Sequence, residues 1–159
     1  LSSYLRWVSG VAALLALGLL IWAPWRGNLY DEFNAAPQMN VAERGAEKTE
    51  LDEAATLFND KKYSKAKVAL AKLNVADPLN TMVAYYYGVS LLETGEVAKG
   101  RLLLEDLFKG ESVYKYDAAY AVAMSYLKED KKADTKFWLE KIPDGAVQYE
   151  KAQQLLKKL

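Results

Sequence analysis

Three acidic clusters are the residues of this chain whose type and spacing could do catalytic chemistry. They are Glu105–Asp106, Glu129–Asp130 and the two acids of the "YDEF" stretch at residues 30–33. Paired carboxyl groups act as general acid and base only when burial shifts the pKa of one of them. Each cluster falls at an expected helix end or in an irregular segment, where both groups are solvated. We therefore expect surface charges here, and we expect the protein not to be an enzyme.

The composition excludes most other site chemistry. The 159 residues include no histidine and no cysteine, which removes disulfides, thiol nucleophiles and nearly all zinc or transition-metal sites. Basic and acidic residues both number 21, so the formal net charge is zero and no nucleic-acid-binding surface is expected. The phosphate-binding and nucleophile motifs GxxxxGK, GxGxxG and GxSxG are absent from the sequence. We expect no cofactor, no metal and no small-molecule substrate.

The first part of the chain contains a run of 19 uncharged residues, from Trp7 to Trp25. As a helix this run would be roughly 28 Å long, which is close to the hydrocarbon thickness of a bilayer. Arg6 and Arg26 bracket the run, and Trp7, Trp22 and Trp25 lie at its ends, where indole rings favour the membrane interface. The pattern predicts a single transmembrane helix within residues 1–26 that contacts lipid through residues 7–25.

A cleaved signal peptide and a buried core helix are the two alternatives. Pro24 follows Ala23 directly, which disfavours cleavage at the one candidate site. The remaining roughly 130 residues could barely surround a helix that is apolar on all faces. One arginine on each side gives no orientation by the positive-inside rule, so the side of the membrane on which the rest of the chain lies is open.

The pattern changes after a connector over residues 27–46, which has no sustained period. From residue 47 onward, apolar residues recur at helical spacing between short breaks, and no alternating β-branched run appears. The sequence therefore predicts an all-α region over residues 47–159. The expected helices are 47–59, 63–75, 79–93, 97–109, 115–129, 132–141 and 146–158.

This region also repeats itself. Small residues recur 34 and 35 positions apart, and the large residues around them keep the same spacing; the aligned sets are Ala54, Gly88 and Ala123, then Leu57, Leu91 and Tyr126, then Leu70, Leu104 and Leu139. A 34-residue helix–turn–helix period resembles the tetratricopeptide repeat. The resemblance implies an α-solenoid of three helix pairs over residues 47–142 and a capping helix over residues 146–158. The whole chain also resembles, more loosely, the span and repeats of bacterial anti-sigma-like membrane proteins.

The resemblance implies that the first helix of each pair lines a concave groove. The implied groove residues are Leu51, Ala55, Phe58, Tyr85, Val89, Leu92, Tyr120, Met124 and Leu127. None of the nine is basic or an amide, so an apolar helix or an extended peptide is the expected ligand. Three alternatives stay open: an open groove, ordinary core, or occupation by the connector itself. We expect Tyr85 to face the groove, Tyr87 to face the core, and Tyr30 and Phe33 of the connector to pack on the array.

Together these features predict a non-enzymatic, membrane-anchored adaptor or scaffold that binds partner proteins, subunits of a membrane complex, in a bacterial envelope. The expected location is the inner membrane, and the resemblance implies that the repeats lie on the periplasmic side. A transmembrane anti-sigma-like regulator and an accessory subunit of a secretion or translocation machine are the alternatives.

Overall fold

The computed structural model describes residues 28–35, 37–41 and 49–159. Over these residues the chain forms eight α-helices and no strand, which confirms the expected all-α class. The helices are α2 (Leu29–Phe33), α3 (Glu50–Asn59), α4 (Tyr63–Ala76), α5 (Thr81–Glu93), α6 (Val97–Lys109), α7 (Lys115–Lys128), α8 (Lys132–Leu139) and α9 (Tyr149–Leu156).

The seven helices expected after the connector are all present, and α2 is an addition. The short helix α2 lies in the connector, where Asn28 caps it by accepting a hydrogen bond from the Tyr30 backbone N–H at 3.1 Å. The last helix begins at Tyr149, three residues later than expected. Pro143 and Gly145, whose φ is +89°, hold the preceding chain in turns.

Among the described residues, no helix combines the length and the apolar character that a membrane span needs. The expected span over residues 7–25, and its interface residues, lie outside the described part of the chain.

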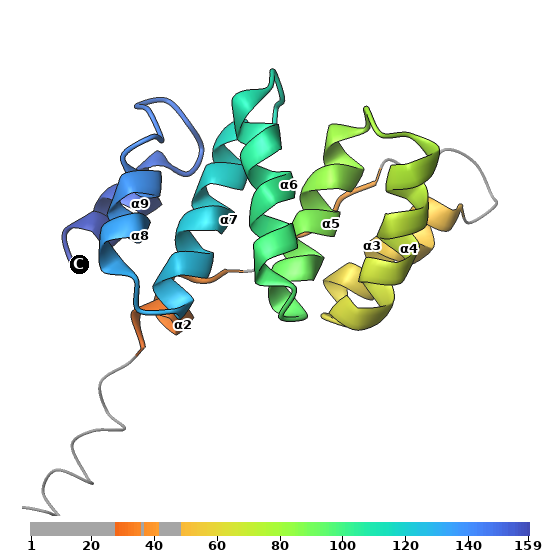
Figure 1. Cartoon of the computed structure of the whole chain (residues 1–159), viewed down its shortest axis with the longest axis horizontal. Coiled ribbons are helices and arrows are strands. Elements are labelled where there is room, and N and C mark those ends of the chain that lie inside the picture. Colours follow the sequence, from red (N-terminus) through yellow and green to blue (C-terminus); the bar gives the residue numbers. More distant parts are fainter. Residues whose placement is uncertain (1–27, 36, 42–48) are drawn as a thin grey trace, which may run out of the picture.

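Helices α3 to α8 lie side by side, each antiparallel to the next and in contact with it, and α9 packs against α8 at one end (Figure 1). The segment that contains α2 starts beneath α7 and crosses behind the row of helices towards α3 (Figure 1). It therefore lies on the face formed by α3, α5 and α7, which we call the first-helix face.

The same tight turn joins α3 to α4, α5 to α6 and α7 to α8. Lys61, Gly95 and Asp130 occupy the left-handed region, with φ of 57°, 86° and 57°. In each turn the next backbone N–H donates back to a carbonyl near the end of the first helix; the pairs are Lys62 to Leu57, Glu96 to Leu91 and Lys131 to Tyr126. Residues 61, 95 and 130 are 34 and 35 positions apart, so the sequence period corresponds to a recurring turn in the structure.

A close helix contact lies between α5 and α6 and depends on two glycines. A Cβ atom at Gly88 would lie 2.7 Å from Leu104 Cγ, and one at Gly100 would lie 3.0 Å from the Gly88 carbonyl oxygen. Interiors are too densely packed to admit such an atom without movement. Ala54 and Ala123, which occupy the place of Gly88 in the neighbouring pairs, are fully buried. The helices therefore cross at small residues in each of these places.

Replacing Lys61 by glycine is expected to stabilise the protein by about 0.5–1 kcal/mol, measured as the free energy of unfolding in urea. A side chain in the left-handed region costs roughly 1–2 kcal/mol, and the greater freedom of glycine in the unfolded chain offsets part of this gain. The matched change Gly95→Ala should destabilise by a similar amount, because nothing lies within 4 Å of the added Cβ and only backbone strain is tested. Unchanged stability in both variants would contradict this account of the turns.

Candidate functional site

The candidate site is the first-helix face together with the N-terminal segment that lies on it. We call residues 28–35 and 37–41 the strap. Seven of the nine expected groove residues are buried, and the other two, Leu51 and Leu92, are partly exposed. The buried ones are Ala55, Phe58, Tyr85, Val89, Tyr120, Met124 and Leu127.

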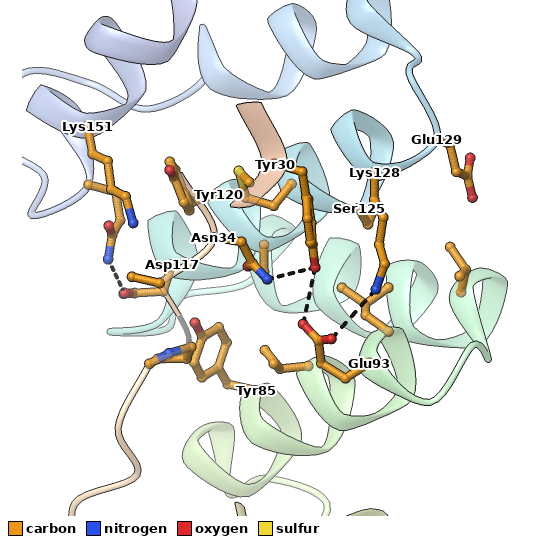
Figure 2. Close-up of a pocket in the computed structure, with 18 residues that line it drawn as sticks. Tyr30, Asn34, Tyr85, Glu93, Asp117, Tyr120, Ser125, Lys128, Glu129 and Lys151 are labelled. Atoms are coloured by element: carbon orange, nitrogen blue, oxygen red, sulfur yellow. Dashed lines mark hydrogen bonds and ion pairs between the residues drawn. The ribbon is translucent and has the colours of Figure 1, made fainter. Parts of the chain in front are cut away.

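The helical end of the strap is tied to α5 and α7 through Tyr30. Its hydroxyl donates to Glu93 Oε1 at 3.3 Å and accepts from Asn34 Nδ2 at 2.7 Å (Figure 2). The Lys128 ammonium lies 5.1 Å from the centre of the Tyr30 ring and 3.7 Å from the Glu93 carboxylate. Burial, followed by the Glu93 charge, raises the pKa of Tyr30 well above its ordinary value, so the hydroxyl stays a donor.

Phe33 is the first apolar anchor of the strap. Its side chain is 4% exposed, and its carbonyl oxygen accepts a hydrogen bond from the Tyr120 hydroxyl at 3.1 Å. The C-terminal end of the chain closes over the same place, because Lys158 forms an ion pair with Glu32 and lies 5.3 Å from the centre of the Phe33 ring. The expectation that Tyr30 and Phe33 pack on the array is confirmed.

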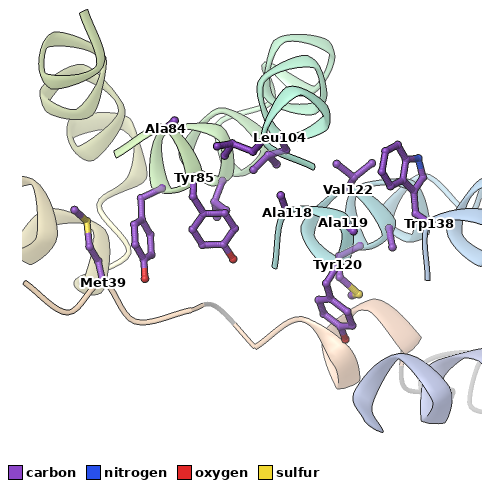
Figure 3. Close-up of a cluster of buried hydrophobic side chains, with 14 of the residues drawn as sticks. Met39, Ala84, Tyr85, Leu104, Ala118, Ala119, Tyr120, Val122 and Trp138 are labelled. Atoms are coloured by element: carbon purple, nitrogen blue, oxygen red, sulfur yellow. The ribbon is translucent and has the colours of Figure 1, made fainter. Parts of the chain in front are cut away.

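Met39 is the second apolar anchor, and its side chain is 2% exposed (Figure 3). The Asn59 side chain grips its backbone at two points: Met39 N–H donates to Asn59 Oδ1 at 2.8 Å, and Asn59 Nδ2 donates to the Met39 carbonyl at 3.0 Å. The Tyr86 hydroxyl donates to the carbonyl of neighbouring Gln38 at 2.7 Å. The side chains of α3, α5 and α7 therefore hold the strap by its backbone, as a neighbouring β-strand would.

Of the alternatives left open by the sequence, occupation of the face by the connector is the one observed.

Tyr85 does face the strap side, but the assignment of Tyr87 to the core was wrong. Tyr86 is the buried neighbour, while Tyr87 is partly exposed with the Lys99 ammonium 5.8 Å from its ring centre. Successive helical residues point about 100° apart, so a one-residue error in assigning the face exchanges the two tyrosines.

Asn59 and Tyr86 were not among the expected site residues. Asn59 directly follows the expected groove residue Phe58, at the last position of α3. A signal was present in the sequence, because an amide beside an apolar groove position suits recognition of a peptide backbone. The resemblance placed the groove at nine positions that contain no amide, so the predicted site did not include Asn59.

A cavity of about 290 Å³ remains between the strap and helices α5, α7 and α9 (Figure 2). Val89 and Met124 give it apolar walls, and Asn34 and Pro37 of the strap close one side. Its polar lining includes Tyr30, Tyr85, Glu93, Asp117, Lys128 and Lys151. No group of three or more acids is placed to hold a metal ion in the described ranges.

The tyrosines of this face are held in their neutral form. Burial raises the pKa of Tyr86 to about 12, with smaller effects from Tyr114 and Asp117. Burial alone raises the pKa of Tyr120 well above its ordinary value. Neutral hydroxyls can donate to carbonyl oxygens, which is what Tyr86 and Tyr120 do towards the strap.

Comparison with known proteins gives no relative. No family model matches the chain, and no curated protein or solved structure matches it either. The assignment to the tetratricopeptide family, and the looser likeness to anti-sigma-like membrane proteins, are therefore corrected. The 34-residue period suggested the family, but any array of short helix pairs with equal turns produces such a period, so the period alone does not establish the family.

The strap contacts should differ in their contribution to stability. Asn59→Ala is expected to lower the free energy of unfolding by about 1–3 kcal/mol, because it leaves the backbone groups of Met39 without partners next to a buried side chain. Tyr86→Phe should lower it by only about 0.5–1.5 kcal/mol, because Gln38 is exposed and water can replace the hydroxyl. Urea unfolding of both variants measures the two values, and a larger loss for Tyr86→Phe than for Asn59→Ala would contradict the assigned roles.

Proposed function

We propose that the chain is a non-enzymatic scaffold whose first-helix face binds an extended segment of polypeptide from a partner protein. The observation that carries this proposal is the way the strap is held. Asn59, Tyr86 and Tyr120 each bond to strap backbone groups, and among the described strap residues Phe33 and Met39 are the buried ones. A face with this chemistry accepts many sequences that offer two apolar anchors six residues apart.

The body of this scaffold, in our proposal, is a solenoid of three repeated helix pairs, α3–α4, α5–α6 and α7–α8, with α9 covering the last pair. The recurring turns at residues 61, 95 and 130 support it. Leu70, Leu104 and Leu139, at one aligned position of the second helices, are all fully buried, which supports it as well. Repeats of this kind present one continuous face to a ligand.

On this proposal the strap is an internal competitor for the partner. A segment joined to its own binding face has an effective concentration in the millimolar range. A partner segment of equal intrinsic affinity would therefore bind the intact chain weakly, and a productive partner needs stronger anchors or a second contact.

Membrane attachment and the envelope location stay predictions from residues 7–25, which lie outside the described residues. No contact of the described part favours the regulator or the secretion-subunit alternative over the scaffold.

A fluorescein-labelled peptide of residues 28–41 tests the proposal by fluorescence anisotropy. The full-length double variant Phe33→Ser/Met39→Ser, whose own strap lacks its anchors, should bind it with a Kd on the order of 1–100 µM. The wild type should bind at least about tenfold more weakly, because its own strap competes. A peptide carrying the same two serines is the matched control and should not bind.

Circular dichroism must show that the helices of the double variant are retained. If the helices are lost, the single variant Phe33→Ser is used in place of the double variant. A folded variant that fails to bind the peptide would rule out peptide recognition by the first-helix face.

A further inference from the structure

The cavity beneath the strap is lined by a tyrosine hydroxyl that the fold does not use. Tyr85 is 4% exposed and lines the cavity, with its hydroxyl turned towards Asp117 (Figure 2). Within residues 28–35, 37–41 and 49–159, this hydroxyl has no hydrogen-bond partner, whereas the neighbouring Tyr86 and Tyr120 hydroxyls each bond to the strap. The hydroxyl opens into the cavity, so it is free to donate a hydrogen bond to a ligand bound there.

Lys151 lines the same cavity from α9, at a position where its charge interacts unfavourably with the dipole of its own helix. It is the third residue of α9, where the helix dipole disfavours a cation. Its ammonium lies 5.1 Å from the centre of the Tyr120 ring, and no carboxylate in the described part of the chain forms an ion pair with it. Burial lowers the pKa of the Lys151 amine, as expected for a cation that lacks a counter-charge.

The acids of the cavity have other partners. Glu93 is paired with Lys128, and Glu129 lies 3.1 Å from Arg101. Asp117 accepts a hydrogen bond from Gln148 Nε2 at 2.8 Å and lies in the first turn of α7, where the helix dipole favours an acid. The unmatched groups of the cavity are therefore one cation and one hydroxyl donor, which together suit an anionic acceptor.

We propose that this cavity binds a carboxylate on an apolar body, with the acid group between Lys151 and the Tyr85 hydroxyl and the body against Val89 and Met124. A volume of about 290 Å³ lies at the lower end of the range for ligand pockets in proteins, so it suits a small ligand. The inference does not rest on the proposed function, and it concerns the chain with its strap in place, because the strap closes one side of the cavity. It departs from the expectation, drawn from the sequence, that no small molecule binds.

Phenylacetate and 2-phenylacetamide test the proposal, because they share a shape and differ in charge. Binding to the full chain is followed through the NMR signal of the Met124 methyl group. Phenylacetate should shift this signal saturably and bind about tenfold or more tightly than the amide. The tripeptide acetyl-Ala-Ala-Phe, added in a parallel titration, decides whether the acid can also be a peptide C-terminus: tighter binding than phenylacetate assigns the site to peptide ends, and weaker binding assigns it to free acids.

Lys151→Met and Tyr85→Phe should each weaken phenylacetate binding about tenfold, because each removes one partner of the acid group and keeps the side-chain volume. Lys157→Met, at the far end of α9, is the matched control and should leave binding unchanged. Circular dichroism confirms that each variant is folded. The absence of a saturable shift up to about 10 mM, equal binding of acid and amide, or unchanged binding by Lys151→Met would each overturn the proposal.

Discussion

The Asn59 side-chain amide makes two hydrogen bonds with the Met39 backbone, and the part of the site beside α3 depends on them. An extended segment that lies on helices has no neighbouring strand, so its backbone groups must find side-chain partners wherever water is excluded. Asn59 supplies both a donor and an acceptor at the point where Met39 enters the core. Without this pairing, burial of the Met39 side chain would leave two backbone groups unsatisfied.

The remaining features of the face follow from this arrangement. With Met39 fixed against α3 and Phe33 fixed against α7, the strap must cross α5 between these two anchors. Tyr30, Asn34, Ala35 and Pro37 of the strap line the cavity, which is a gap left between the strap and the face. The Tyr85 hydroxyl and Lys151 border this gap, and the described strap residues supply neither with a partner. The strap thus covers part of the first-helix face and leaves a polar cavity beside it.

Local periodicity was enough to predict the helices. α4, α6, α7 and α8 begin at the expected residues, because apolar spacing and the breaks between helices are properties of short stretches. The crossing points at Ala54, Gly88 and Ala123 could also be predicted, since a close helix contact requires a small side chain. The path of the strap could not be predicted, because it depends on contacts between residues far apart in the sequence, such as Phe33 and Tyr120, and these leave no periodic signal. The same limit explains why Asn59 and Tyr86 were missed and why the period suggested a family that no comparison supports.

The central claim is that the strap is a bound segment whose backbone is held by side chains of the first-helix face. Hydrogen exchange of the Met39 backbone amide in the intact protein tests it most directly, because this N–H is the donor to Asn59. The account predicts that the Met39 amide exchanges as slowly as amides in the middle of α5, while the amide of the exposed Asn40 exchanges quickly. Exchange of the Met39 amide at the rate of an unstructured peptide would contradict it.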